Sequence, residues 1–458
     1  MNTPCTRLTA AAIASMFLLV MGMESRAEEP AAWRAGSSTV KITPEQPMWM
    51  AGYAARNKPS EGVMQDLYVK ILVIEDAEDA SAVIVTCDLI GIPRALRESL
   101  EEEVASRFGI PRDALLLNAS HTHCGPELRT RKASAYGLGE DRIRQAEEYL
   151  RSLQEKLLNG IGEAIDGLEP ARLEYCRARC GFAMNRRLPA GDSYRNSPNP
   201  DGPVDHSVPV LVVRGEDNEI KTLLFGYACH NTTLGIYQFC GDYAGYAQEY
   251  LEESLPGVQA MFLMGCGGDQ SPYPRREIPL VKQHGRTLCN SVLAALQTPP
   301  QPLSGPLRCA IDSAPLEFAP PDSREELEQQ ANSDNKYRKR HALLLLEELE
   351  TTGTIRTDYD YLAQAIRFGD DMLLIALAGE VVVDYSLRLK QELDAPIVWV
   401  AGYSNDVFGY VPSLRVLKEG GYEAGGAFLY SAFPGPFTET VEDRVMEAIS
   451  KVVERTAE

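Results

Sequence analysis

Positive charge is scarce in this sequence. Its 458 residues include 45 lysines and arginines against 65 aspartates and glutamates, which gives a formal net charge of −20. Such a surface repels phosphate backbones and anionic lipids, and this argues against a role in binding nucleic acid. The sequence also lacks a P-loop, a Gly-x-Gly-x-x-Gly turn after an apolar run and a Gly-x-Ser-x-Gly elbow. These absences argue against nucleotide chemistry and against the serine triad of α/β-hydrolases.

Long apolar runs are missing after the N-terminal segment, so no transmembrane segment is expected in the mature chain. Residues 1–27 have the pattern of a signal peptide. Arg7 precedes an apolar run, and Ser25-Arg26-Ala27 forms a small-x-small cleavage site before Glu28. The sequence therefore predicts an exported, soluble protein that is periplasmic or secreted.

The ten cysteines include no Cys-x-x-Cys pair, which argues against a thiolate zinc knuckle and against a thioredoxin-type redox site. Removal of Cys5 with the signal peptide leaves nine, an odd number. An oxidising compartment permits disulfides, but the sequence does not determine their pairing.

Short apolar runs alternate with helical patterns along the mature chain. Several runs are apolar at consecutive positions, which is typical of strands covered on both faces. The apolar runs lie at 67–76, 81–90, 114–120, 208–215, 221–230, 258–266, 371–380 and 395–404, and the helical patterns at 94–109, 141–165, 324–350 and 441–456. The stretches 188–203 and 297–306 are predicted to be linkers. We expect residues 28–458 to form a single α/β domain with a layered mixed β-sheet and flanking helices.

Polar residues that are able to bind a metal follow four of these runs. His121 and His123 follow the run at 114–120, and His230 ends the run at 221–230. Glu380 ends the run at 371–380, and Tyr410 follows the run at 395–404. Ligands of α/β proteins bind beyond the carboxyl ends of strands, so we expect these side chains to gather at one edge. Two histidines and a carboxylate, with one open position, are the usual composition of a catalytic zinc site.

The His-Thr-His pair is the strongest of these signals, because the chain has only six histidines. His121 and His123 stand at alternate positions of an extended segment, so their side chains point the same way and can converge on one centre. Each residue also has an ordinary interpretation. His230 can be a hydrogen-bonded core residue, Glu380 can cap the following helix, and Tyr410 can serve packing alone. The remaining histidines are predicted to be structural: His206, His284 and His341.

A fifth apolar run ends in FLMGCGGDQSPYP, residues 262–274. Its glycines let the backbone turn sharply and approach a ligand closely. Ser271 can act here as a nucleophile, with neighbouring N–H groups as oxyanion donors, or it can simply cap the turn before Pro272.

In their order along the chain, these segments resemble the neutral/alkaline (non-lysosomal) ceramidase family. The resemblance rests on AGYAAR (51–56), SHTHCGP (120–126), MNRR (184–187), CHNTT (229–233), GDYAGYA (241–247), GGDQSP (267–272), AGE (378–380), SNDVFGYV (404–411) and YEAGGA (422–427). The order matches the family throughout, and that order is more specific than any single motif.

The resemblance implies a catalytic Zn²⁺ ion held by four residues. In this sequence the matching positions are His121, His230, Glu380 and Tyr410. It also implies that Ser271, in the Gly-Asp-x-Ser-Pro motif, is the residue assigned as nucleophile. His123 would then lie beside the metal and position the substrate or stabilise the oxyanion.

The chain departs from the family at a few places. Glu127 and Leu128 stand where ceramidases usually have Gly-Gly, Tyr273 stands where they have Asn, and no C-terminal immunoglobulin-like domain is expected. We predict an exported zinc-dependent amidohydrolase that acts on a small-molecule or lipid N-acyl substrate, as in sphingolipid metabolism. The alternatives are a zinc esterase or amidase with a soluble non-ceramide substrate, and a non-catalytic exported protein that retains the fold. Attack by Ser271 or by water stays open at this point.

Overall fold

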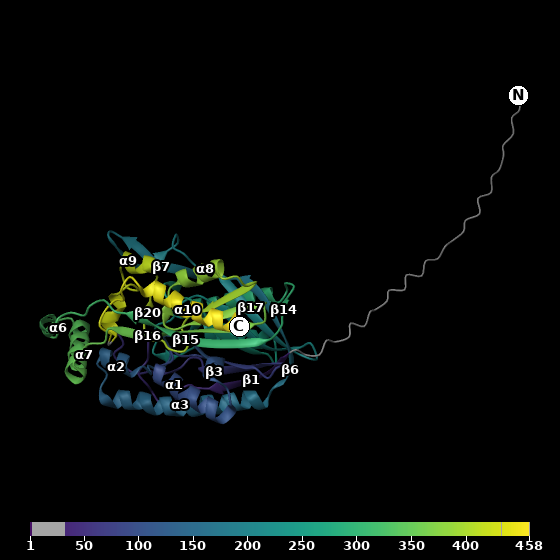
Figure 1. Cartoon of the computed structure of the whole chain (residues 1–458), viewed down its shortest axis with the longest axis horizontal. Helices are drawn as coiled ribbons and strands as arrows, with labels where there is room; N and C mark the ends of the chain where they lie inside the picture. The colour runs from purple at the N-terminus through teal and green to yellow at the C-terminus, as the bar shows by residue number, and fades with distance from the viewer. Residues whose placement is uncertain (2–32, 432, 458) are drawn as a thin grey trace. The chain divides into compact units, whose positions relative to one another are not determined.

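The computed structural model describes Met1, residues 33–431 and residues 433–457, with Arg131 described by its backbone alone. The predicted signal peptide lies, apart from Met1, outside the described residues. From Trp33 onward the described residues belong to one compact unit (Figure 1). None of the helices in this part of the chain combines the length and the apolar character that a membrane span requires.

The largest sheet has nine strands of mixed direction. Their order is β12-β10-β9-β6-β1-β3-β4-β5, and β14 pairs with β6. The bounds are β1 (Trp33–Lys41), β3 (Tyr68–Asp76), β4 (Ser81–Cys87), β5 (Leu115–Ala119), β6 (Glu169–Arg179), β9 (Ser207–Gly215), β10 (Ile220–Tyr227), β12 (Gln259–Met264) and β14 (Gln301–Leu303). The pairs β10/β12 and β4/β5 are parallel, and the others are antiparallel.

This sheet curls until its two ends approach each other. Strands β12 and β5 stand at opposite ends of the strand order, yet they are in contact. The backbone N–H of Met264 on β12 donates to the side-chain oxygen of Asn118 on β5 at 2.8 Å. Strand twist accumulates at about 20–25° per pair, so seven pairs turn one edge strand through roughly half a circle relative to the other. The curl brings the segments that follow β5, β10 and β12 to one place.

A second sheet of four strands lies beside the first, in the order β15-β16-β17-β19. Its strands are β15 (Leu307–Glu317), β16 (Asp358–Phe368), β17 (Met372–Leu377) and β19 (Ile397–Ala401), of which β17 and β19 are parallel. Smaller ladders join β13 (Gln270–Pro272), β7 (Ala183–Ala190) and β8 (Ser193–Asn199), then β18 (Glu380–Val381) and β20 (Tyr410–Val411), and β2 (Gly62–Val63) and β11 (Gln238–Phe239).

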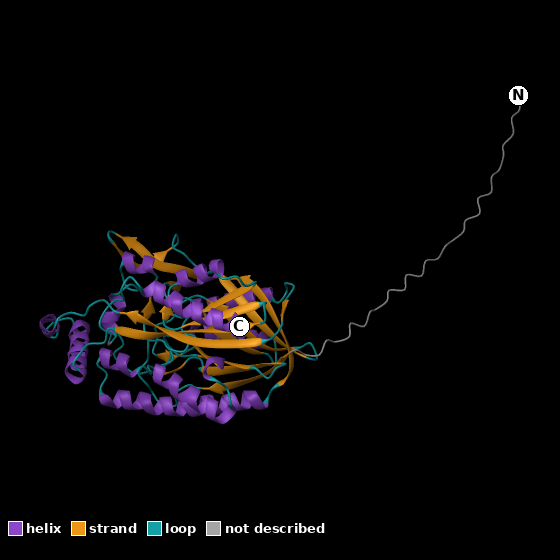
Figure 2. Cartoon of the chain, in the orientation of Figure 1, coloured by secondary structure: helices purple, strands orange, loops and turns teal. Residues whose placement is uncertain are grey.

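Helices cover the outer faces of the two sheets (Figure 2). The helices are α1 (Arg94–Phe108), α2 (Thr130–Tyr136), α3 (Glu140–Asp166), α4 (Asp242–Ser254), α5 (Ile278–Ala295), α6 (Arg324–Gln330), α7 (Lys336–Thr352), α8 (Val383–Glu392), α9 (Leu414–Glu419) and α10 (Val441–Ala457), with short 3₁₀ turns at Arg112–Ala114 and Gly426–Tyr430. Helix α3 packs on β1 and β3 of the large sheet, and α10 packs on β15 and β16 of the second sheet.

The layers follow from strands that are apolar on both faces. In β17, Leu374 faces a core shared with the large sheet, while its neighbours Leu373 and Ile375 face the core under α10. Alternate side chains of a strand point to opposite faces, so a run of consecutive apolar residues is buried between two layers. The layered α/β fold expected from the sequence is confirmed, with helices on both outer sides of two stacked sheets.

Three local predictions were wrong, at least in part. The stretch 188–203, predicted to be a linker, completes β7 and forms β8, so it is largely a hairpin, and part of 297–306 forms β14. The helical pattern at 324–350 is broken into α6 and α7, because Asn335 accepts hydrogen bonds from the N–H groups of Tyr337 and Arg338 and so begins a new helix.

Candidate metal centre

Two histidines reach a common centre from the ends of different strands. His121 follows β5, and His230 follows β10. Nδ1 of His121 contacts the carbonyl oxygen of Ile90 at 2.5 Å, and Nδ1 of His230 contacts that of Gly267 at 2.8 Å. A carbonyl oxygen only accepts, so each Nδ1 donates the hydrogen bond and each Nε2 is left to face the common centre.

A carboxylate and a phenol meet these two Nε2 atoms. Oε2 of Glu380 lies 3.3 Å from Nε2 of His121 and 3.5 Å from Nε2 of His230. The hydroxyl oxygen of Tyr410 lies 3.4 Å from Nε2 of His230. Ligand atoms around a tetrahedral ion with bonds of about 2.0–2.1 Å stand about 3.4 Å apart. The spacing of the donors therefore fits a zinc-sized ion.

The pairing of two short strands aligns the carboxylate with the phenol. Glu380 begins β18 and Tyr410 begins β20, and the two are register partners in this parallel ladder. Gly268 lies against the same segment, where an added Cβ would stand 2.6 Å from the carbonyl oxygen of Glu380. Glu380 does not cap α8, as its position had suggested, because Asp269 accepts the hydrogen bond from the N–H of Val383 at 2.8 Å.

Several buried residues near the centre adopt a left-handed backbone. His121 has φ of 60°, Tyr403 of 52° and Asn405 of 62°. Residues other than glycine adopt this region at a cost, and it persists only where the surroundings hold it. Here Asn405 is held by Gln364, whose side-chain oxygen accepts from its amide at 2.7 Å. Because of its positive φ, His121 does not continue β5 as an extended segment, contrary to the expectation from the sequence.

His123 lies beside the two other histidines. Its ring centroid is 5.0 Å from that of His121 and 5.5 Å from that of His230, and suitable nitrogens of all three rings lie within 4.8 Å of one another. Tyr53 packs on its other side at 4.8 Å between centroids. Gly52 makes room for the ring, since an added Cβ would stand 2.2 Å from its Nδ1.

Burial controls the protonation of these side chains. It lowers the pKa of His123 and of His230 well below the usual range, and neighbouring cationic groups, Arg186 among them, lower both further. Burial also raises the pKa of Tyr410 well above its ordinary value, against the attraction of Arg186. The rings of His123 and His230 are thus neutral, and the phenol of Tyr410 gives up its proton only with a stronger cation close by.

Several buried polar atoms of the predicted site residues have no hydrogen-bond partner. They are both ring nitrogens of His123, Oγ of Ser271 and Oε2 of Glu380. An unmade hydrogen bond of a buried group costs about 1–3 kcal/mol, so a cluster of such atoms marks a place built for a ligand. Nε2 of His121 and Nε2 of His230 face this same carboxylate oxygen, and a cation between the three groups would bind all of them.

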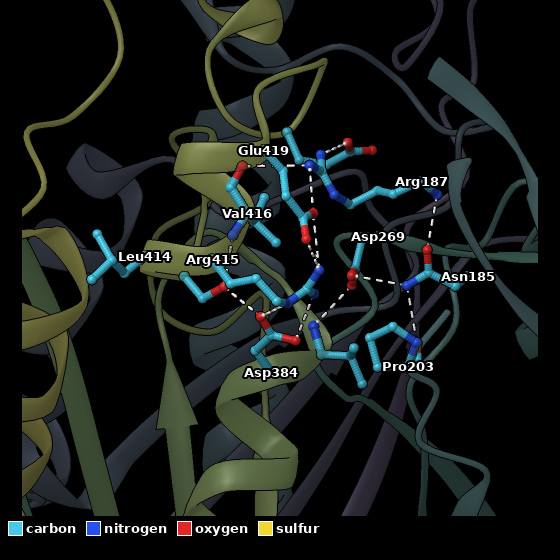
Figure 3. Close-up of polar contacts among 12 residues, drawn as sticks. Asn185, Arg187, Pro203, Asp269, Asp384, Leu414, Arg415, Val416 and Glu419 are labelled. Atoms are coloured by element: carbon cyan, nitrogen blue, oxygen red, sulfur yellow. Dashed lines mark hydrogen bonds and ion pairs between the residues drawn. The ribbon is translucent and has the colours of Figure 1, made fainter. Parts of the chain in front are cut away.

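Ser271 lies on β13, beside a residue that contacts the backbone of His230. Its strand pairs with β7, and Gln270 beside it accepts a hydrogen bond from the backbone N–H of His230 at 2.9 Å. Asp269 anchors the same turn, since its carboxylate also accepts from the side-chain amide of Asn185 at 3.1 Å (Figure 3). The glycine-rich turn is therefore fixed to both β7 and the start of α8.

The structure adds buried charges that the sequence did not single out. Nη2 of Arg186 donates to the hydroxyl of Tyr410 at 2.9 Å, and its Nε donates to Glu423 at 2.9 Å. Arg187 donates to the second oxygen of Glu423 at 2.8 Å. The motifs MNRR and YEAGGA contain these residues, but nothing in the sequence pairs the two motifs.

The other three histidines contact backbone carbonyl oxygens away from this centre. Nε2 of His206 lies 2.8 Å from the carbonyl oxygen of Ala183. The corresponding distances are 2.7 Å from His284 to Pro274 and 2.6 Å from His341 to Phe433.

Residues 33–274 match the sequence model of the family described as neutral/alkaline non-lysosomal ceramidase, N-terminal. The chain belongs to this family. The resemblance drawn from the sequence motifs is thereby confirmed, and membership supports a ceramidase-like hydrolase. No curated protein matches the chain.

Two solved ceramidase structures share the fold. The neutral ceramidase from Pseudomonas aeruginosa is 18% identical, with a TM-score of 0.73, over 93% of this chain and 75% of that one. A ceramidase complexed with C2 is 19% identical, with a TM-score of 0.72, over 93% of this chain and 76% of that one.

Proposed function

We propose that this protein is an exported zinc-dependent hydrolase that cleaves a linear amide, or N-acyl, bond. The proposed zinc ligands are His121, His230, Glu380 and Tyr410. The observation that carries the proposal is the convergence of two imidazole nitrogens on one carboxylate oxygen, since Oε2 of Glu380 lies within 3.5 Å of Nε2 of both His121 and His230. Imidazole and carboxylate ligands suit zinc, and the donor spacing agrees with its bond lengths.

His123 offers a second possible ligand, because the three histidines alone also form a compact group. We assign it to the substrate instead. Both of its ring nitrogens are unbonded, whereas those of His121 and His230 are fixed by carbonyls through Nδ1. Ligand histidines are usually oriented by such a contact.

Zinc, when bound, would supply Lewis acidity to the scissile carbonyl group or to the attacking water. Ser271 is the proposed nucleophile that forms a bond to the carbonyl carbon, since its Oγ is buried and makes no competing hydrogen bond. The neutral ring of His123 can accept a proton or donate to the developing oxyanion. Arg186 would hold the hydroxyl oxygen of Tyr410 in place as a ligand.

The family and its solved members make ceramide, an N-acyl lipid, the first substrate to test within the wider class of N-acyl compounds. Export rests on the pattern of residues 1–27. The nine cysteines from Cys87 to Cys309, all within the described residues, are free, so no disulfide among them supports the oxidising compartment.

Metal content of the purified mature protein tests the proposal. We expect about one zinc per chain, as for a single set of ligands. His230→Ala should lose it, while His341→Ala, which removes a histidine outside the centre, should retain it. Zinc-loaded wild type should then hydrolyse at least one member of a panel of ceramides, N-acyl amino acids and simple esters. A wild type that binds no zinc after reloading would contradict the proposal.

A further inference from the structure

A second charged feature adjoins the proposed nucleophile. A cavity of about 100 Å³ is lined by Ser271, by Arg186 and by Arg275, with Asn196 and Tyr273 at its walls. Arg275 follows β13 closely in the chain, so its side chain and that of Ser271 are carried by one short segment. This small cavity therefore places a guanidinium group near the atom that we propose attacks the substrate.

The guanidinium of Arg275 has no acidic partner among the described residues. Its one hydrogen bond runs from Nη1 to Oγ1 of Thr232 at 3.4 Å. Burial lowers its pKa, and the neighbouring cations Arg276 and Arg186 lower it further. A half-buried cation surrounded by other cations is unfavourable unless an anion joins them.

Two other arginines around the centre pair with carboxylates, and buried Arg56 donates to three backbone carbonyl oxygens. Arg186 pairs with Glu423 at 2.9 Å, and Arg129 pairs with Glu127 at 2.8 Å. Arg276 is exposed and donates to the hydroxyl of Tyr53 at 2.7 Å. Arg275 thus differs from these neighbours because it is partly desolvated and its guanidinium makes a single hydrogen bond of 3.4 Å, in a protein whose net charge is −20.

We propose that Arg275 binds a carboxylate group of the substrate, and that the substrates are N-acyl-α-amino acids. A carboxylate matches the planar fork of a guanidinium through two parallel hydrogen bonds. Arg275 and Ser271 line the same small cavity. An anion held by Arg275 must therefore lie within a few bonds of the carbonyl carbon that Ser271 attacks. An α-carboxylate meets this condition, because it is separated from the amide nitrogen by a single carbon atom. The inference rests on the proposed hydrolase function and specifies its substrate class.

The reaction is an ordinary hydrolysis. The amide C–N bond breaks and a C–O bond to the carbonyl carbon forms, at the expense of one water molecule. The amide nitrogen gains two protons and leaves as the ammonium group of the amino acid, and the acyl group leaves as a carboxylate. No oxidant, reductant or second substrate is needed.

The test compares matched substrates on zinc-loaded protein. N-lauroylglycine carries the carboxylate, N-lauroylglycinamide has the same shape without the charge, and a short-chain ceramide represents the family substrate. Hydrogen bonds between charged groups contribute enough to change binding by about tenfold to hundredfold. We expect wild type to prefer the carboxylate by at least about tenfold in kcat/KM, mainly through a lower KM.

Three variants separate the role of Arg275 from a general effect of charge. Arg275→Ala should abolish the preference with unchanged zinc content, and Arg275→Lys should retain part of it. Arg276→Ala removes a neighbouring positive charge and should leave the preference intact.

Each remaining outcome counts against the inference. Hydrolysis of ceramide or of the glycinamide as fast as of N-lauroylglycine would overturn it and leave the proposed hydrolase function standing. An equal preference in wild type and in Arg275→Ala would do the same. Failure to hydrolyse any of the three substrates with zinc bound would refute both the inference and the proposed function.

Discussion

Replacing Glu423 by glutamine should destabilise the protein strongly, although the side chain hardly changes in volume. Glu423 lies between Arg186 and Arg187, at 2.9 and 2.8 Å, and its side chain is only 2% exposed. Glu423→Gln leaves two buried guanidinium groups facing a neutral amide. Breaking a buried ion pair by removing one charge costs about 3–5 kcal/mol. We expect the lower end, about 3 kcal/mol, because Arg187 keeps Glu419 and Arg186 keeps its hydrogen bond to Tyr410.

Equilibrium unfolding in urea measures this loss, with a chelator present so that bound metal does not add to the apparent stability. The matched control is Glu419→Gln. Glu419 faces the same Arg187 at 3.2 Å, but its side chain is 19% exposed, so we expect a loss below about 1 kcal/mol. Equal losses of less than about 1 kcal/mol in both variants would refute the reasoning, because buried and partly exposed partners would then be equivalent.

Three further predictions concern the glycine-rich turn. Ser271→Ala should lower kcat/KM by more than about a hundredfold with zinc retained, and a rate within about tenfold of wild type would show that water attacks. Gly268→Ala should weaken zinc binding by about tenfold or more with little change in circular dichroism, since the new Cβ would stand 2.6 Å from the carbonyl oxygen of Glu380. Burial raises the pKa of Asp269 from 3.8 to about 7. The folded state then holds a proton that the unfolded state releases, so this contribution to stability is complete below about pH 4 and disappears as the pH rises through 7. The unfolding free energy of wild type minus that of Asp269→Asn should therefore fall by about 1.4 kcal/mol per pH unit in this window, and a constant difference would mean that the folded carboxyl is ionised throughout.

The sequence by itself determined the layered α/β fold and the family. Consecutive apolar residues, as in β17, can be buried only between two layers, so the runs along the chain indicate stacked sheets without knowledge of their pairing. These strands end close to the ends of their apolar runs, so the polar residues found there, such as His121 and His230, stand at strand ends. The ordered motifs add the family, because their sequence of appearance does not depend on the tertiary structure.

Sequence patterns predicted secondary structure less well in segments whose side chains are half exposed. The hairpin of β7 and β8 lies in a stretch that is rich in Pro, Gly and Asn, and its pattern of exposure gives no regular alternation. The break between α6 and α7 was equally hidden, because charged residues continue on both sides of the capping residue Asn335.

Only the tertiary structure decided how the candidate centre is assembled. The curl of the large sheet brings β5 to β12, and the register of β18 and β20 sets Glu380 beside Tyr410. Twist and register are properties of many strands together, and no local segment encodes them. The pairing of Arg186 with Glu423 and the lack of an acidic partner for Arg275 also depend on contacts between residues distant in the sequence. Residue types thus specify which chemistry is possible, and the packing of the chain decides which side chains meet to perform it.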